Sequence, residues 1–139
     1  MDPLQKAFLH GLRDRVDFVR YHTLLLTTEL LRSQYMKLSA LVIARLLPLL
    51  MDKDATIRNT LEKETLAVIE EQFPTVYTDN YVTVMFLINR VPYGVYNDIK
   101  NLEMPYNPIC FLNHNFSGPL KRNERMTIYK FMVSMMRIS

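Results

Sequence analysis

The stretch of residues 17–47 decides the fold, and it reads DFVRYHTLLLTTELLRSQYMKLSALVIARLL. It is rich in leucine and contains neither proline nor glycine, so we predict one long helix. Pro48 should kink or end that helix, because proline cannot continue the backbone hydrogen-bond ladder. The leucines exceed what one apolar stripe can hold. A helix that is apolar on two sides either lies at the centre of a bundle or shares its second side with a partner.

Helical signals also surround this stretch. Pro3 suits the first position of an N-terminal helix. Asp52 and Asp54 are natural caps for a further helix over residues 55–72, which Pro74 closes. We interpret the two aspartates as capping residues and not as a metal-binding pair, because a helix start favours carboxylates. The first half of the chain is therefore predicted to be a bundle of long helices.

The residue pattern changes after Phe73. Residues 81–88, YVTVMFLI, are β-branched and aromatic, which favours a strand, and residues 109–112, ICFL, form a second candidate strand. Four of the seven prolines lie between residues 92 and 119, which excludes a long helix there. Apolar spacing then predicts a last short helix over residues 123–136.

The predicted fold class is therefore α+β. A mainly α-helical domain, with long helices in a bundle, covers residues 1–74, and a small β-rich module with a short C-terminal helix covers residues 75–139. Hydrophobic residues make up 49% of the 139-residue chain and charged residues 22%, which is enough apolar material for a buried core. The net charge of +3 comes from residues 74–139, so a basic patch there is allowed but nucleic acid is not specifically indicated.

Neither a catalytic site nor a metal site is visible in the residue spacing. His10, His22 and His114 lie far apart, and none has the four-residue spacing that places two ligands on one helix face. Cys110 lies in an apolar run, which favours a buried structural thiol over a nucleophile, although His114 follows four residues later. The three glycines are isolated and cannot form a phosphate-binding loop. We therefore expect no enzyme activity, no cofactor and no metal, unless a site is assembled from scattered residues.

The sequence also predicts where the protein works. The N-terminus lacks the basic and apolar regions of a signal peptide, and the most apolar stretch, residues 38–51, is too short to span a bilayer. The single cysteine fits a reducing compartment. We expect no membrane span and an intracellular location, nuclear or cytoplasmic.

Three stretches resemble a known family. Residues 31–38, LRSQYMKL, are similar to the central helix of subunits of the GINS complex, an accessory of the replicative helicase. Residues 79–82, DNYV, resemble the entry to that family's first β-domain strand, and residues 109–138 match its closing strand, loop and helix in length. Residues 119–122, PLKR, stand where the family has a turn. The chain looks most similar to the subunit that supplies the "Go" of the acronym.

This resemblance implies a non-catalytic scaffold subunit of a multiprotein complex in DNA replication, bound to other protein subunits as a hetero- or homo-oligomer. Partner-binding residues are then expected at Leu31, Arg32, Tyr35, Met36, Leu38, Lys121, Arg122 and Arg125.

Two alternatives stay open from the sequence. One is a small helical regulator, of viral origin for instance, that binds one partner protein in a groove. The other is a nucleic-acid-binding accessory that makes a weak contact through the basic residues of the C-terminal segment, residues 121–137, by neutralising phosphate charge. A solvated helix face explains the same basic residues equally well.

Overall fold

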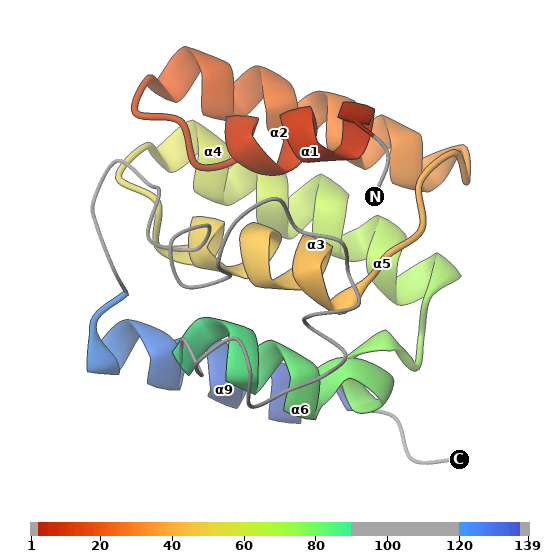
Figure 1. Cartoon of the computed structure of the whole chain (residues 1–139), viewed down its shortest axis with the longest axis vertical. Helices are drawn as coiled ribbons and strands as arrows, with labels where there is room; N and C mark the ends of the chain where they lie inside the picture. The colour runs from red at the N-terminus through yellow and green to blue at the C-terminus, as the bar shows by residue number, and fades with distance from the viewer. Residues whose placement is uncertain (1–2, 90–119, 137–139) are drawn as a thin grey trace.

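The computed structural model describes residues 3–89 and 120–136, and these residues form helices stacked in three layers (Figure 1). Helices α1 and α2 form one outer layer, α3 lies in the middle layer with α4, η2 and α5, and α6 and α9 form the other outer layer. In chain order the elements are α1 (Pro3–Gly11), α2 (Asp17–Arg32), α3 (Ala40–Leu46), the 3₁₀ turn η1 (Leu47–Met51), α4 (Ala55–Thr60), the π-helical turn η2 (Leu61–Thr65), α5 (Leu66–Gln72), α6 (Val76–Asn89) and α9 (Arg122–Met135).

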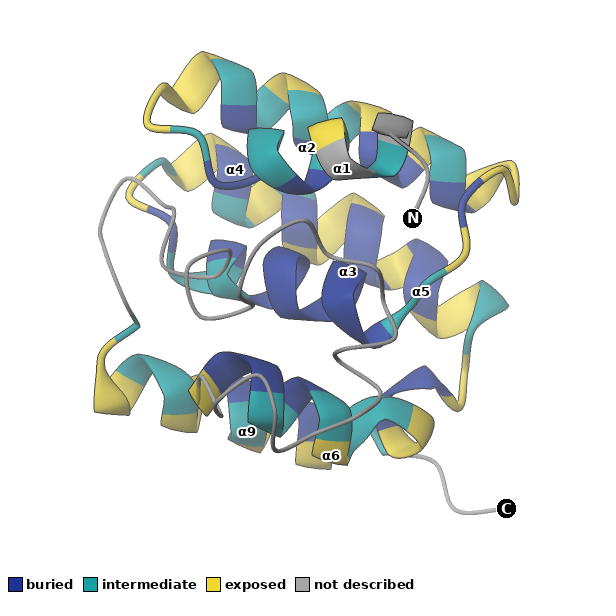
Figure 2. Ribbon diagram, viewed as in Figure 1, coloured by how far each residue is buried: buried dark blue, intermediate teal, exposed yellow. Residues whose placement is uncertain are grey.

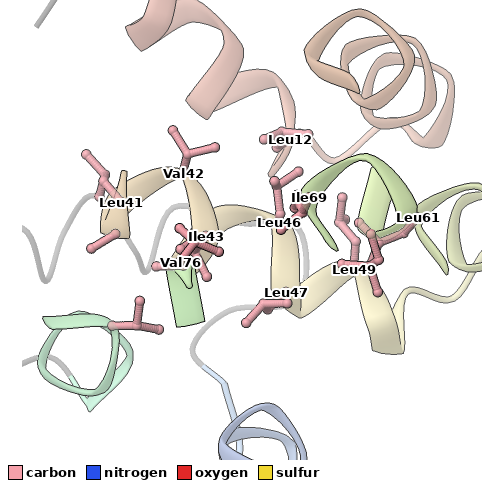
Figure 3. Packing of buried hydrophobic residues seen from close by; sticks show 14 of the residues in the cluster. Leu12, Leu41, Val42, Ile43, Leu46, Leu47, Leu49, Leu61, Ile69 and Val76 are labelled. Atoms are coloured by element: carbon pink, nitrogen blue, oxygen red, sulfur yellow. The ribbon is translucent and has the colours of Figure 1, made fainter. Parts of the chain in front are cut away.

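The core is centred on α3. All seven residues of this helix are buried, which Figure 2 shows as a helix coloured dark blue throughout. A helix without a polar face must be covered on every side. Residues from all three layers meet in one continuous apolar cluster, and Figure 3 shows Leu12, Ile69 and Val76 around Leu46 and Ile43 of α3. The expected central helix is therefore α3 alone, and it lies between the two outer layers.

The prediction of one long helix over residues 17–47 is wrong. Helix α2 ends at Arg32, and α3 begins at Ala40 after seven intervening residues. Ser39 caps the new helix, because its side chain accepts a hydrogen bond from the Val42 backbone N–H at 3.4 Å. Serine is a favoured N-cap residue, so this start signal was present in the sequence.

The end of α2 is a turn that usually contains glycine. Gln34 has a φ of 64°, in the left-handed region. The backbone N–H of Tyr35 donates to the Leu30 carbonyl at 3.0 Å, and that of Gln34 donates to the Leu31 carbonyl at 3.1 Å. These two bonds define a Schellman motif, in which the left-handed position favours glycine. Because the chain has glutamine there, the sequence shows no glycine stop signal.

Replacing Gln34 with glycine should raise the free energy of unfolding by about 0.5–1 kcal/mol, because glycine adopts the left-handed conformation without a steric penalty. Thermal or denaturant unfolding of the variant measures this. Ser33→Gly is the matched control, since Ser33 has a φ of −86° and its hydroxyl donates to the Glu29 carbonyl at 2.8 Å. That control should lower stability, and equal effects of the two changes would contradict the assignment of the turn.

Two of the predicted helices are confirmed. Residues 55–72 form the run α4–η2–α5, and Asp54 caps it by accepting hydrogen bonds from the backbone N–H groups of Thr56 at 2.7 Å and Ile57 at 3.4 Å. The π-helical turn at its middle places the Thr65 hydroxyl 2.6 Å from that of Thr28 in α2, inside the core. The predicted last helix, residues 123–136, corresponds to α9 within one residue at each end.

The predicted β-rich module is wrong in the residues that the structure describes, because residues 3–89 and 120–136 contain no strand. Residues 81–88 lie within α6. Tyr77, Val84 and Ile88 recur at helical spacing and are buried against the core, so packing overrides the strand preference of the β-branched residues. The candidate strand at residues 109–112 lies outside the described residues, and the boundary between residues 74 and 75 stays a prediction.

Gly11 ends α1 at the point where this helix meets α2. A Cβ atom on Gly11 would lie 2.5 Å from the Thr23 hydroxyl oxygen and 2.9 Å from its methyl carbon. Thr23 is β-branched and has little freedom to move its side chain away. Glycine therefore permits the close approach that keeps α1 against α2.

Candidate functional site

Helix α2 carries an apolar strip on the side that faces away from the core. Phe18, His22 and Leu26 follow one another at four-residue spacing, and all three are exposed. Phe18 is 67% exposed and Leu26 is 47% exposed, which are high values for large apolar side chains. The Phe18 and His22 rings lie 4.2 Å apart between centroids, so they form one continuous surface. We call these three residues the α2 outer face.

The opposite side of α2 explains why this face is uncovered. Leu24 and Leu31 are completely buried and pack with α4, η2 and α5. Because α2 lies at the edge of the stack, no helix among the described residues covers its other side, and Figure 2 shows yellow along the outer edge of α2. The prediction placed two apolar sides on one long helix, whereas the exposed apolar residues Phe18 and Leu26 lie on the shorter edge helix α2.

Two further apolar side chains are exposed just beyond the ends of α2. Val16 precedes the helix and is 53% exposed, and Tyr35 follows it and is 85% exposed. Charged groups lie beside the strip. Glu29 and Arg32 form an exposed ion pair with 2.5 Å between oxygen and nitrogen. An apolar centre with polar groups around it is the usual composition of a protein-binding surface.

A buried ion pair holds the start of α2 in place, and sequence spacing did not reveal it. The Arg20 guanidinium donates to both carboxylate oxygens of Asp52, at 2.9 Å and 3.0 Å, and to the backbone carbonyls of Asp14 and Arg15. Asp52 also accepts from the Asp54 backbone N–H at 2.9 Å. The two charges are 32 residues apart in the chain, and only Asp54 acts as the helix cap that was predicted for both aspartates.

Of the partner-binding residues predicted within residues 31–38, some are buried and others are exposed. Leu31 and Met36 are buried in the core, and Leu38 is half-buried against it. Arg32 and Tyr35 are exposed at the end of α2. The exposed strip itself, Phe18, His22 and Leu26, was missed, although its four-residue spacing on a helix with too many apolar residues was a usable signal.

The predicted basic residues lie in the other outer layer, at the start of α9. Lys121 and Arg122 are exposed, and the Glu124 carboxylate accepts a hydrogen bond from the Lys121 backbone N–H at 2.8 Å. Arg125 donates to the Leu120 carbonyl at 2.8 Å, so its guanidinium is partly used within the chain. The two predicted groups therefore lie on opposite outer layers and do not form one site (Figure 1).

The described residues show little that suggests catalysis. Within residues 3–89 and 120–136, no three His, Cys, Asp or Glu side chains come together as metal ligands. Burial raises the pKa of the Tyr77 hydroxyl, with a further contribution from Glu70, and burial also raises the pKa of Tyr129, although Arg125 opposes this. Both tyrosines pack at the α6–α9 layer. Cys110 and His114 lie outside the described residues.

None of the helices that the structure describes has both the length and the apolar character needed to cross a bilayer.

Sequence comparison finds similarity to two subunits of the condensin-2 complex. The chain is 28% identical over 123 residues to condensin-2 complex subunit D3 of Mus musculus, and 24% identical over 126 residues to condensin-2 complex subunit D3-L of Xenopus laevis. Each match covers 88% of this chain but only 8% of the longer protein. No family model matches the chain. No solved structure matches it either.

These comparisons overturn the resemblance to the GINS family. The similarity found is to condensin-2 subunits, and it runs along most of the chain. The resemblance rested on short patterns such as Leu-Arg and Met-Lys pairs, which occur on many helices. One pattern required a strand entry at residues 79–82, yet these residues lie in the middle of α6. The chain is thus similar to a subunit of a protein complex, but of a different kind from the one expected.

Proposed function

We propose that this chain is a helical docking module of a multiprotein, chromosome-associated complex, that it works in the nucleus as a scaffold, and that it has no catalytic activity. The similarity to condensin-2 complex subunit D3 over 88% of the chain supports this assignment. Because the chain corresponds to only 8% of that subunit's length, the proposal concerns a docking role and not the whole activity of such a subunit.

The α2 outer face is the observation that carries the proposal. The core is already closed around α3, so Phe18 and Leu26 are not needed to complete it. Large apolar side chains gathered on an exposed helix face are typical of surfaces that bind another protein. The Phe18 ring contacts the His22 ring at an interplanar angle of 53°, and exposed aromatic residues are among those that contribute most to binding energy at interfaces.

The absence of a catalytic role is part of the proposal and is argued from the arrangement of the side chains. Arg20 and Asp52 are buried and bond to each other. Arg20 also donates to the Asp14 carbonyl, and Asp52 accepts from the Asp54 backbone N–H, which fits a structural function. The two tyrosines whose pKa values are raised are packed between helices, where burial alone explains the shift. Neither arrangement places a nucleophile beside a base in the way that covalent catalysis requires.

The Phe18→Asp/Leu26→Asp double variant should lose its protein partners while remaining folded. Both side chains are exposed in the free chain, so aspartate there costs little in stability, whereas a desolvated carboxylate in an interface costs several kcal/mol. Tagged full-length chain, purified from nuclei, should bring down subunits of a condensin-type complex in stoichiometric amounts, and the double variant should bring down at least about tenfold less.

The matched control is Ala55→Asp/Ala67→Asp, which adds the same two charges at exposed positions on α4 and α5. This control should keep its partners. Circular dichroism and thermal unfolding must show both variants folded. If the wild-type chain recovers no subunit of a condensin-type complex, or if the two double variants behave alike, the proposed function is wrong.

A further inference from the structure

Helix α9 has an exposed strip of its own, at the far side of the stack from α2. Arg122, Met126, Lys130 and Val133 follow one another at spacings of four, four and three residues, which places them on one side of a helix. Met126 is 43% exposed and Val133 is 55% exposed. The opposite side of α9 carries the buried residue Ile128 together with Met132. We call the four exposed residues the α9 strip.

In the strip, exposed apolar side chains alternate with positively charged ones. Arg122 and Lys130 lie on either side of Met126 along the helix and line a shallow groove with Asn123 and Thr127. Within α9 the acidic residue is Glu124, and its carboxylate already accepts the backbone N–H of the residue before the helix. The charge of the strip is therefore not balanced by its own helix.

The position of the charge adds to this imbalance. Lys121 and Arg122 lie at the N-terminal end of α9, where the partial positive charge of the helix dipole disfavours cations. Arg125, which also lies in the first turn, donates to the Leu120 carbonyl at 2.8 Å. No such contact with a described residue is recorded for the Arg122 side chain, which is exposed. Negative charge supplied from outside the chain would stabilise this end of the helix.

We propose that the α9 strip binds an acidic amphipathic helix of a partner protein. Apolar residues of that helix pack on Met126 and Val133, and carboxylates at its margins pair with Arg122 and Lys130. This mode is the usual one by which an amphipathic helix lies in an apolar groove. Nucleic acid fits less well, because phosphates pair with cations but offer nothing to Met126 and Val133, the two exposed apolar side chains that alternate with the cations.

The proposal goes beyond the docking role of α2. The α2 outer face and the α9 strip belong to the two opposite outer layers (Figure 1), so both can be occupied at once. A chain with two independent docking surfaces joins two proteins, one on each side. The α9 strip recognises its partner helix by charge as well as by apolar contact. A neutral apolar helix would therefore bind it less well.

The test is selection from a displayed library of helical peptides of about 18 residues, with apolar residues at every third or fourth position and charge varied elsewhere. The full chain is the bait. Enriched peptides should carry Asp or Glu beside the apolar positions. Binding of an enriched synthetic peptide should weaken about tenfold in the Arg122→Glu/Lys130→Glu variant, because both charge pairs become repulsive. Higher salt should also weaken it.

The matched control is Lys37→Glu/Lys63→Glu, which changes the net charge equally at exposed positions outside α9. The control and the Phe18→Asp/Leu26→Asp variant should both bind the peptide like wild type, so this test is independent of the α2 surface. Neutral or basic enriched peptides, or equal losses in the two charge-reversal variants, would overturn the proposal. So would tighter binding of a short DNA duplex than of the peptide, if the same α9 variant abolished it.

Discussion

Replacing Asp52 with alanine should lower the free energy of unfolding by about 3–5 kcal/mol, because Arg20 would stay buried without its carboxylate. Arg20 is 3% exposed and Asp52 is 2% exposed, so water cannot take over the lost interaction. The same change removes the acceptor of the Asp54 backbone N–H. The total free energy of unfolding of natural domains is about 5–15 kcal/mol, so the variant should lose a large part of its stability. Denaturant unfolding measures this loss.

Glu29→Ala provides the control, since it removes an ion pair on the surface. The Glu29 and Arg32 side chains are 60% and 47% exposed, and such pairs contribute less than about 1 kcal/mol. The Arg20→Leu/Asp52→Leu double variant should lose less unfolding free energy than the two single variants lose together, because it leaves no unpaired charge in the core. Additive losses would show that the two residues act independently, against the geometry of the pair.

Replacing Tyr77 with phenylalanine should raise the free energy of unfolding by up to about 1 kcal/mol, while Tyr77→Ala should lower it by about 3–5 kcal/mol. The Tyr77 side chain is 2% exposed, and its hydroxyl oxygen has no hydrogen-bond partner in the part of the chain that the structure describes. Phenylalanine removes that unsatisfied group and keeps the edge-to-face contact with Phe131, whose ring centroid is 5.5 Å away at 89°. Alanine removes the ring and leaves a cavity between α6 and α9.

Thermal unfolding of the two variants separates the contribution of the hydroxyl from that of the ring. Tyr81→Phe makes the same chemical change and serves as the control, because Tyr81 is only half-buried on the same helix. Its hydroxyl is not among the buried groups that lack a hydrogen-bond partner in the part of the chain that the structure describes. That control should leave stability within about 0.5 kcal/mol of wild type. A loss of stability in Tyr77→Phe as large as in Tyr77→Ala would mean that the hydroxyl has a partner.

Helical parts with a strong start signal were predictable from the sequence. Asp54 is followed by residues with helical apolar spacing, and the cap hydrogen bonds to Thr56 and Ile57 show why that signal succeeded. The last helix was predictable for a similar reason, since Ile128 and Met132 lie on one face at four-residue spacing. In both cases the information is local, because each residue acts within one or two turns of helix.

The sequence alone did not reveal where the candidate docking surfaces lie. The leucine surplus in residues 17–47 predicted a second apolar side on one long helix, but most of these leucines lie in the core of a structure with two separate helices. Leu31 and Met36 were expected to bind a partner, but both lie in the core. Phe18 and Leu26 are exposed instead, because α2 ends at Arg32 and lies at the edge of the stack. The orientation of a helix relative to the core depends on what packs against it, which no spacing within the helix determines.

By itself, the sequence determined that the chain has helices over residues 55–72 and near its C-terminal end, and that residues 17–47 hold more apolar surface than one stripe requires. Only the tertiary structure decided three other features. Residues 81–88 are helical because their side chains fill the space against α3, the Gln34 turn divides α2 from α3 without a glycine, and Arg20 pairs with an aspartate 32 residues away. The helix at residues 81–88 and the Arg20–Asp52 pair depend on contacts between distant segments, and such contacts outweigh local preferences that differ by about 1 kcal/mol or less per residue. The turn at Gln34 is closed by local hydrogen bonds to the Leu30 and Leu31 carbonyls, but no glycine marks it in the sequence.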